Sequence, residues 1–171
     1  LLEKMGGCID VESVPGEGST FTFRLPFKVN DVLIQKEERN ESSEKPLAGM
    51  HFLLAEDNEI NMEIAEFYLT DLGATVSKAW NGKEALELFE ASEPESYDVI
   101  LMDVMMPEMD GHEATQRIRA LKRPDTQTVR IVAMTAQTSE DSIQKCLDAG
   151  MDGHIAKPIN EEKLLSVLHK I

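Results

Sequence analysis

The sequence of 171 residues has no long hydrophobic run, only two cysteines, few aromatic residues and little positive charge. No apolar run approaches the roughly 18 residues that cross a bilayer, which excludes a membrane-spanning segment within these residues. Cys8 and Cys146 lie too far apart for a disulfide framework or a metal cluster, and they favour a reducing compartment. Because no secretory signal opens the chain, we predict a cytoplasmic fragment of a longer protein. A membrane anchor elsewhere in that parent protein stays open.

Acidic residues outnumber basic ones by 32 to 17, and the net charge is −15. Such a surface repels nucleic-acid phosphates, so we predict no nucleic-acid partner and no membrane contact by this fragment. The excess is concentrated in residues 50–171, which carry 23 acidic and 11 basic residues. An acidic domain of this kind suits a basic protein surface or a divalent cation.

The first 27 residues have the pattern of a helix end followed by a β-hairpin. Residues 1–5 are predicted to end a helix at a Gly-Gly pair, and strand-like runs at 8–14 and 19–27 flank a Pro-Gly turn. The second run alternates apolar and polar residues, which predicts one apolar face: Phe21, Phe23, Leu25 and Phe27. A lone hairpin is marginal in water, so this face was made to pack against something outside the fragment.

Residues 28–49 differ in composition from both flanks. The stretch 35–45 has no apolar residue at all and cannot offset the entropy cost of becoming ordered. We therefore predict a flexible linker over 28–49.

From residue 50 onward, strand-like and helix-like periods alternate five times. Strands are predicted at 51–55, 75–80, 99–102, 129–134 and 153–156, and helices at 58–72, 81–91, 111–122, 140–149 and 160–170. On the second helix we expect Ala85, Leu88 and Phe89 to face the core. Continuous rather than alternating apolar strands indicate a parallel sheet buried on both faces, with right-handed crossovers. The prediction is a doubly wound α/β domain with a five-stranded parallel sheet.

Ligands of such folds bind at the carboxyl ends of the strands, where this sequence places polar residues. Glu56 and Asp57 end the first strand and Asp103 ends the third, so three carboxylates should converge. Two like charges about 4 Å apart repel by roughly 4 kcal/mol at an effective dielectric constant of 20. A cluster of oxygen ligands therefore favours a hard cation such as Mg²⁺. Thr135 and Lys157 end the last two strands and add a hydroxyl and a positive charge.

A carboxylate, Mg²⁺, a lysine and a hydroxyl are the groups that phosphoryl transfer to an aspartate requires. Each acidic residue alone is better explained as a helix cap, and only the combination with Thr135 and Lys157 points to this chemistry.

Four stretches around these residues resemble the receiver domain of two-component response regulators. They are LLAEDN at 53–58, MDVMMPEMDG at 102–111, MTA at 134–136 and GMDGHIAKP at 150–158. The resemblance covers residues 50–171 and implies the flavodoxin-like receiver fold. It also implies that Asp103 is the phosphoacceptor, Lys157 the phosphate-binding lysine and Thr135 the switch hydroxyl. The implied Mg²⁺ ligands are Glu56, Asp57, Asp103 and the backbone carbonyl of Met105. Pro158 would follow a cis peptide bond.

Two positions suggest how this receiver would differ from others. His154 stands where receivers usually carry Tyr or Phe as a second switch residue, and we hypothesise that an imidazolium there makes signalling sensitive to pH. Met105 lies two positions after the phosphoacceptor and cannot activate water, so we expect a moderately long-lived phosphoryl group.

Residues 1–27 resemble the last stretch of a histidine-kinase ATP-binding domain, through the MGG motif at 5–7, Glu12-Ser13 and GEGSTF at 16–21. The remaining nucleotide-binding motifs have no counterpart, so no ATP binding is expected. Remnant, linker and receiver in this order resemble the C-terminal end of a hybrid sensor histidine kinase. The fragment would then catalyse only its own phosphorylation and dephosphorylation.

The partner implied by this resemblance is the phosphohistidine domain of a kinase or phosphotransfer protein, and a homodimer through the last two helices is a further expectation. Three alternatives remain open. One is a degenerate receiver that acts as a protein-interaction module. The second is an aspartate-dependent phosphatase-like enzyme, which would need an acid at position 105. The third is an ATP-dependent kinase module.

Overall fold

The computed structural model describes residues 6–16, 18–26, 45–136 and 139–169, and the chain divides into one unit within Leu1–Ser43 and a second within Glu44–Ile171. The first unit is an antiparallel hairpin of β1 (Cys8–Val14) and β2 (Gly18–Arg24). The expected helix end at 1–5 and most of the expected linker lie outside the described residues.

One face of the hairpin is apolar, as the alternation predicted. Ile9 stands opposite Phe23 and Val11 opposite Phe21, so the four side chains share one side of the ribbon. All four are exposed, from 56% for Ile9 to 65% for each phenylalanine. Among the described residues of this unit, nothing buries the apolar face of the hairpin.

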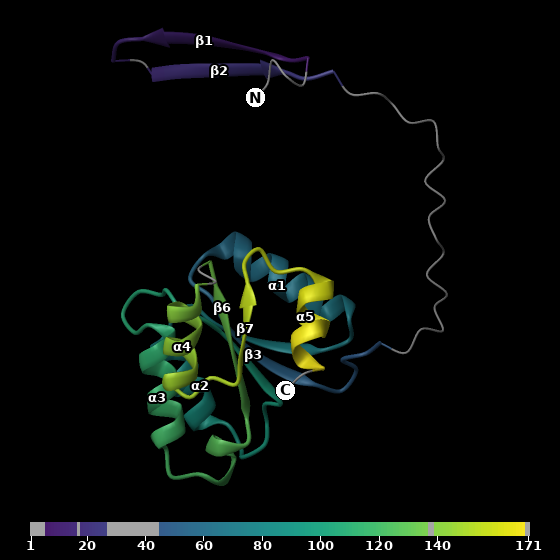
Figure 1. Ribbon diagram of the computed structural model, residues 1–171, viewed down its shortest axis with the longest axis vertical. Coiled ribbons are helices and arrows are strands. Elements are labelled where there is room, and N and C mark those ends of the chain that lie inside the picture. Colours follow the sequence, from purple (N-terminus) through teal and green to yellow (C-terminus); the bar gives the residue numbers. More distant parts are fainter. Residues whose placement is uncertain (1–5, 17, 27–44, 137–138, 170–171) are drawn as a thin grey trace. The chain divides into compact units, whose positions relative to one another are not determined.

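The second unit alternates strands and helices in the predicted order (Figure 1). Its elements are β3 (His51–Ala55), α1 (Glu59–Asp71), β4 (Thr75–Ala79), α2 (Gly82–Ala91), β5 (Val99–Asp103), α3 (Gly111–Ala120), a 3₁₀ helix (Pro124–Gln127), β6 (Arg130–Thr135), α4 (Glu140–Asp148), β7 (Gly153–Ala156) and α5 (Glu161–Leu168). The strands form one parallel sheet in the order β4-β3-β5-β6-β7. The predicted five-stranded doubly wound fold is confirmed, whereas the 3₁₀ helix was not foreseen.

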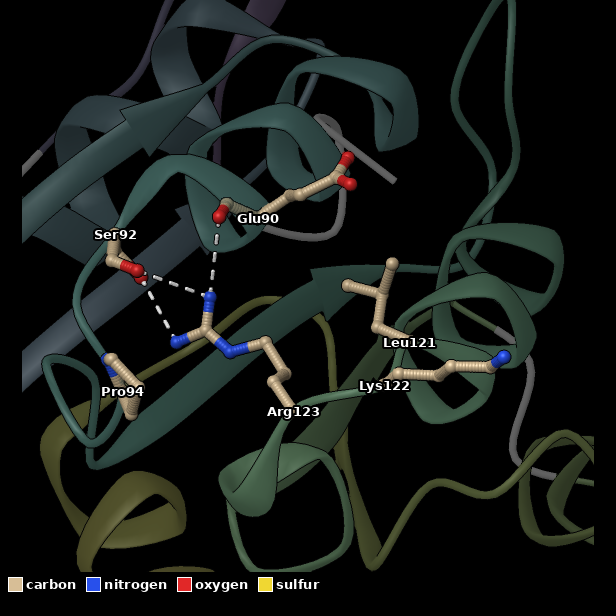
Figure 2. Close-up of a pocket in the computed structure, with 6 residues that line it drawn as sticks. All are labelled: Glu90, Ser92, Pro94, Leu121, Lys122 and Arg123. Carbon is tan, nitrogen blue, oxygen red and sulfur yellow. Dashed lines mark hydrogen bonds between the residues drawn. The ribbon is translucent and has the colours of Figure 1, made fainter.

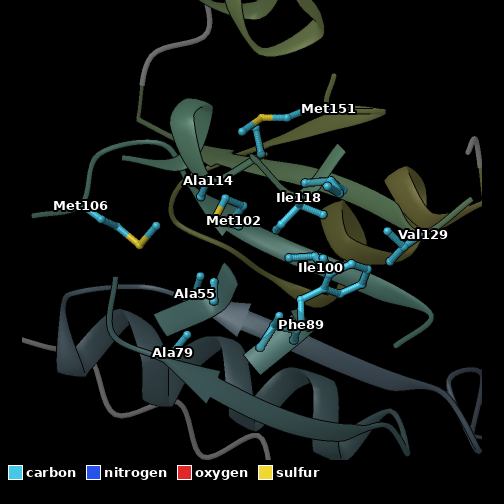
Figure 3. Packing of buried hydrophobic residues seen from close by; sticks show 14 of the residues in the cluster. Ala55, Ala79, Phe89, Ile100, Met102, Met106, Ala114, Ile118, Val129 and Met151 are labelled. Carbon is cyan, nitrogen blue, oxygen red and sulfur yellow. The ribbon is translucent and has the colours of Figure 1, made fainter. Parts of the chain in front are cut away.

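Helices cover both faces of the sheet and separate its core into two clusters. On one face α2, α3 and α4 pack through residues such as Phe89, Ile118 and Cys146 (Figure 3). On the other face α1 and α5 pack through Met62, Leu69 and Leu164 and lie next to each other in Figure 1. Because β5 lies between both layers, each of its five residues is buried, which explains the uninterrupted apolar run of its first four residues.

Residues 45–49, which we assigned to the linker, pack against the second unit. Leu47 is buried in the α1–α5 cluster, and its amide donates to the carbonyl of Leu72 at 3.0 Å. The folded unit therefore begins a few residues earlier than the composition indicated.

One helical face differs from expectation, and a second helix carries two apolar stripes. Leu88 was expected in the core but is 37% exposed, while its neighbours Ala85 and Phe89 are fully buried; the inward prediction for Leu88 was wrong. On α1 the buried positions are Met62, Ala65 and Leu69, and a second apolar stripe of Ile60, Ile64 and Phe67 faces outward. Periodicity alone did not distinguish the two stripes, since both follow helical spacing.

A capping side chain marks the start of each α-helix. The caps are Asn58, Asn81, Asp110, Ser139 and Asn160. Their oxygens accept backbone N–H groups that the first helical turn leaves unpaired. None of the helices in the described part of the chain is both long and apolar enough to cross a bilayer.

The opposite end of the domain, where the helices finish, is held by Arg123 (Figure 2). Its guanidinium donates to the carbonyls of Phe89 and Ser92 at the end of α2 and forms a bidentate pair with buried Asp125. It also stacks over the Phe89 ring at 4.3 Å. One side chain thereby joins the end of α2 to the loop after α3.

Candidate functional site

Three carboxylates meet at the carboxyl end of the sheet. Glu56 and Asp57 follow β3 and Asp103 ends β5, and these strands are hydrogen-bonded neighbours with Ala55 opposite Met102. One ligand oxygen from each carboxylate lies within 4.8 Å of the other two. Glu56 and Asp103 are buried at 1% and 5% exposure, whereas Asp57 is exposed. The predicted convergence of these residues is therefore what the strand order produces.

Lys157 reaches this cluster from the end of β7, which lies on the opposite side of β5 from β3 in the strand order. It follows β7, and its backbone amide donates to the carbonyl of Thr135 at 2.9 Å. The Lys157–Pro158 peptide bond is cis, as the resemblance implied. The ammonium nitrogen lies 2.6 Å from Oε2 of Glu56 and 2.7 Å from Oδ2 of Asp103. A single cation thus bridges two buried carboxylates.

The loop after β5 gives Asp103 a further contact. The amide of Met105 donates to Oδ1 of Asp103 at 3.3 Å, and the Met105 side chain is 78% exposed. At the start of α3, Gly111 packs against the Asp103 backbone so closely that a Cβ would overlap the carbonyl oxygen. Only glycine therefore allows α3 to begin beside the phosphoacceptor candidate.

Burial and the positive charge act on these groups in opposite directions. Burial raises the pKa of Asp103 and the charge of Glu56 adds to the rise, although the hydrogen bond and charge of Lys157 oppose it. For Lys157, burial lowers the pKa, but hydrogen bonds and charges from Asp103 and Glu56 outweigh burial and raise it overall. The lysine is therefore held in its charged form, as a site for anionic groups requires.

The two expected switch residues occupy different surroundings. Thr135 ends β6 beside β5, is 7% exposed, and follows Met134, which pairs with Asp103. His154 lies on the edge strand β7, half-buried, and lines a groove of about 390 Å³ with residues of α5 that include Lys163 and Val167. The structure thus brings Thr135 to the strand end that carries the site, and it places His154 beside α5.

One residue of the site was missed in the sequence. The side-chain amide of Asn61, in the first turn of α1, donates to Oε1 of Glu56 at 2.9 Å. The available signal was the pair of asparagines at positions 58 and 61, within four residues of the acidic pair.

The donors of this cluster fit Mg²⁺. They are all carboxylate oxygens, which suit a hard divalent cation, and the exposed Asp57 leaves one side accessible to solvent. Among the described residues, this is the one group of three or more acidic, histidine or cysteine side chains arranged closely enough for a metal ion.

Comparison with known proteins agrees with the geometry. The family model of the response regulator receiver domain matches residues 52–169. The aerobic respiration control sensor protein ArcB of Escherichia coli is 35% identical over 170 residues, which span 99% of this chain and 21% of ArcB. Probable histidine kinase 2 of Oryza sativa is 40% identical over 139 residues, 75% of this chain and 13% of the kinase. The chain therefore spans about a fifth or less of these relatives.

Solved structures give the same result. One match is the receiver domain of the sensor histidine kinase PA1611 from Pseudomonas aeruginosa, with a TM-score of 0.62 and 37% identity over 70% of this chain and 93% of that domain. The structure of the PA1611 domain has a magnesium ion coordinated in the active-site cleft. The chemotaxis protein CheY4 of Vibrio cholerae matches with a TM-score of 0.65 and 30% identity, over 71% of this chain and 98% of CheY4.

Proposed function

Since this chain belongs to the response regulator receiver domain family, we propose that it accepts a phosphoryl group from phosphohistidine onto Asp103 as one step of a phosphorelay. The observation that carries the proposal is the contact of one buried carboxylate with a lysine on one oxygen and a backbone amide on the other. This arrangement suits a nucleophile whose product is a charged acyl phosphate.

In the proposed reaction a carboxylate oxygen of Asp103 attacks the phosphorus in line with the P–N bond. That bond breaks, the histidine nitrogen leaves with the electron pair, and the imidazole takes up a proton from solvent. Lys157 is positioned to follow the developing charge because its ammonium already contacts Oδ2 of Asp103. Thr135, at the end of the neighbouring strand, would donate its hydroxyl hydrogen to the bound phosphoryl group.

Glu56, Asp57 and Asp103 would hold Mg²⁺, together with the carbonyl of Met105. When bound, the ion neutralises charge on the phosphoryl oxygens. The three carboxylates around the site otherwise repel an incoming anion, which gives the cation a clear role. The magnesium ion in the related PA1611 domain supports this assignment.

The outward-facing apolar stripe of α1, called the outer stripe below, supports the proposal that the phosphodonor is a protein. Ile60, Ile64 and Phe67 are 67%, 39% and 63% exposed on one face. The stripe adjoins the site because Ile64 and Lys157 line the same small cavity. Its flanks carry Glu59, Glu63 and Glu66. A helix with apolar positions bordered by Lys or Arg, next to the reactive histidine, would complement this surface.

The parent protein is proposed to be a hybrid sensor histidine kinase, with residues 1–27 as the end of its ATP-binding domain, 28–44 as the connection and 45–171 as the receiver. The match to ArcB over 99% of the chain supports this order, because it includes the hairpin region as well as the receiver. The apolar face of the hairpin is consistent with burial in a larger domain. A cytoplasmic location, a homodimer through α4 and α5 and pH-sensitive signalling through His154 stay predictions.

The direct test is intact mass after incubation with acetyl phosphate and Mg²⁺, beside Asp103→Asn and a chelated sample. We expect one phosphoryl adduct that is lost in both controls. No adduct, with Mg²⁺ binding intact, would instead indicate a degenerate receiver that acts through protein contacts alone.

A further inference from the structure

The side chain of Glu56 is held at both of its oxygens. Lys157 lies 2.6 Å from Oε2, and the amide nitrogen of Asn61 lies 2.9 Å from Oε1, with the backbone amide of Asn58 more distant at 3.4 Å. Glu56 is only 1% exposed, so solvent cannot replace either partner easily. The orientation of this carboxylate is therefore set by two side chains from different elements.

The position of Asn61 follows from the way α1 begins. Asn58 caps the helix, and its side-chain oxygen accepts the backbone amide of Asn61 at 3.1 Å. This cap fixes the first turn, which directs the Asn61 side chain toward the end of β3. The direction of the bond to Glu56 is also fixed chemically, since an ionised carboxylate only accepts hydrogen bonds and the amide nitrogen must donate.

The two contacts on Glu56 have different consequences. Lys157 also contacts Asp103 at 2.7 Å, so it is divided between two carboxylates. Asn61 contacts Glu56 without that competition. A cavity of about 20 Å³, lined by Glu56, Asn61, Lys157 and three neighbours, lies beside this arrangement. Without the amide of Asn61, the Glu56 carboxylate would have room to turn away from the other two acids.

We infer that Asn61 is a positioning residue for the acidic cluster: by donating to Oε1 it holds Glu56 in the orientation that, together with Asp57 and Asp103, binds Mg²⁺. The inference rests on the proposed function, because it gives Asn61 a purpose only where the cluster takes the cation. Groups that orient metal ligands by hydrogen bonds typically change metal affinity by about 10- to 100-fold when removed.

The test compares Asn61→Leu with the unchanged chain in Mg²⁺ titrations. Leucine has a similar shape but no donor, and it favours helix more than asparagine does. Trp80 is a useful reporter because it is the sole tryptophan and follows Ala79, whose carbonyl accepts the Glu56 amide. We expect the dissociation constant for Mg²⁺ to rise about tenfold, while the chain without Mg²⁺ stays fully folded at the temperature of the titration.

Two further variants separate positioning from a general effect on the helix. Asn61→Gln keeps an amide donor and should recover part of the lost affinity. Thr70→Leu makes a comparable change at an exposed position of the same helix and should leave Mg²⁺ binding unchanged. Equal losses in Asn61→Leu and Thr70→Leu, or partial unfolding at the temperature of the titration that accounts for the weaker binding, would overturn the inference.

Phosphorylation of the unchanged chain by acetyl phosphate distinguishes a failure of the Asn61 role from a failure of the proposed function. If that chain is phosphorylated but Asn61→Leu binds Mg²⁺ with unchanged affinity, the positioning role is wrong and the proposed function stands. If the unchanged chain neither binds Mg²⁺ nor takes up a phosphoryl group, the proposed function fails and the role of Asn61 fails with it.

Discussion

The ammonium of Lys157 lies 2.7 Å from Oδ2 of Asp103, so the candidate nucleophile has its countercharge in place before any phosphoryl group arrives. The same ammonium lies 2.6 Å from Glu56, and both carboxylates are buried. Lys157 therefore serves the stability of the domain as well as its proposed chemistry.

Lys157→Met separates these two contributions. Without the cation, two buried carboxylates face each other, and we expect the free energy of unfolding in EDTA to fall by about 2–4 kcal/mol. Phosphoryl uptake from acetyl phosphate should slow roughly 100-fold, since a group that stabilises the transition state is lost. Urea denaturation and timed intact mass measure the two effects. Lys83→Met, at an exposed position of α2, is the control, and an equal result for both variants would refute the prediction.

Arg123 is expected to be a major stabilising residue although it lies at the end of the domain opposite the site. Its guanidinium contacts several carbonyls after α2 and pairs with Asp125, which is 3% exposed. Lysine cannot reproduce that set of donors. Arg123→Lys should therefore lower the free energy of unfolding by about 2–4 kcal/mol in urea titrations. The neighbouring Lys122 is exposed, and Lys122→Ala should change stability by less than about 0.5 kcal/mol.

Because of the Arg123–Asp125 ion pair, we expect part of the free energy of unfolding to be lost in acid. The hydrogen bond from Arg123 lowers the pKa of Asp125, so the folded chain releases this proton more readily than the unfolded chain does. The contribution is complete above the unfolded pKa of about 3.9 and is lost as the pH falls from there through the lowered folded pKa. Asp125→Asn should be less stable near pH 7, and its unfolding free energy should decline less over that acid range. Parallel curves for the two proteins would contradict this.

The sequence predicted the fold and the centre of the site because both depend on local signals. The continuous apolar run of β5 indicated a strand buried on both faces, and the end of that run located Asp103. Parallel strands finish at one edge, so the meeting of Glu56 with Asp103 needed no knowledge of side-chain contacts.

Contacts between distant segments were not predictable in this way. Arg123 bonds to carbonyls 30 to 34 positions earlier in the chain, and nothing in the local pattern selects those acceptors. Leu88 was misassigned because the core admits only part of the apolar face of α2. The role of Asn61 also depends on which way the first turn of α1 directs its side chain, and composition does not reveal that direction.

The side chain at position 105 is expected to control how long the phosphoryl group on Asp103 survives. The Met105 side chain is 78% exposed beside Asp103 and has no group that can orient an attacking water. Met105→Asn introduces an amide at this position, and we expect the acyl phosphate to be lost several-fold faster after the phosphodonor is removed. The decay can be followed by intact mass at fixed Mg²⁺. An unchanged decay rate would show that the side chain at 105 does not control access of water.

The outer stripe of α1 allows an experiment to distinguish a protein phosphodonor, which would dock on it, from acetyl phosphate, which would not. Phe67 is 63% exposed, and the buried positions of α1 lie on another face. Phe67→Lys should therefore leave the fold and the uptake of phosphoryl groups from acetyl phosphate unchanged. Transfer from an autophosphorylated histidine kinase should slow about tenfold or more, because a docking contact is replaced by a charge that must be desolvated. Thr70→Lys, on the same helix, controls for the added charge. If both variants accept phosphoryl groups from the kinase at the rate of the unchanged chain, the partner must dock on another surface around Asp103.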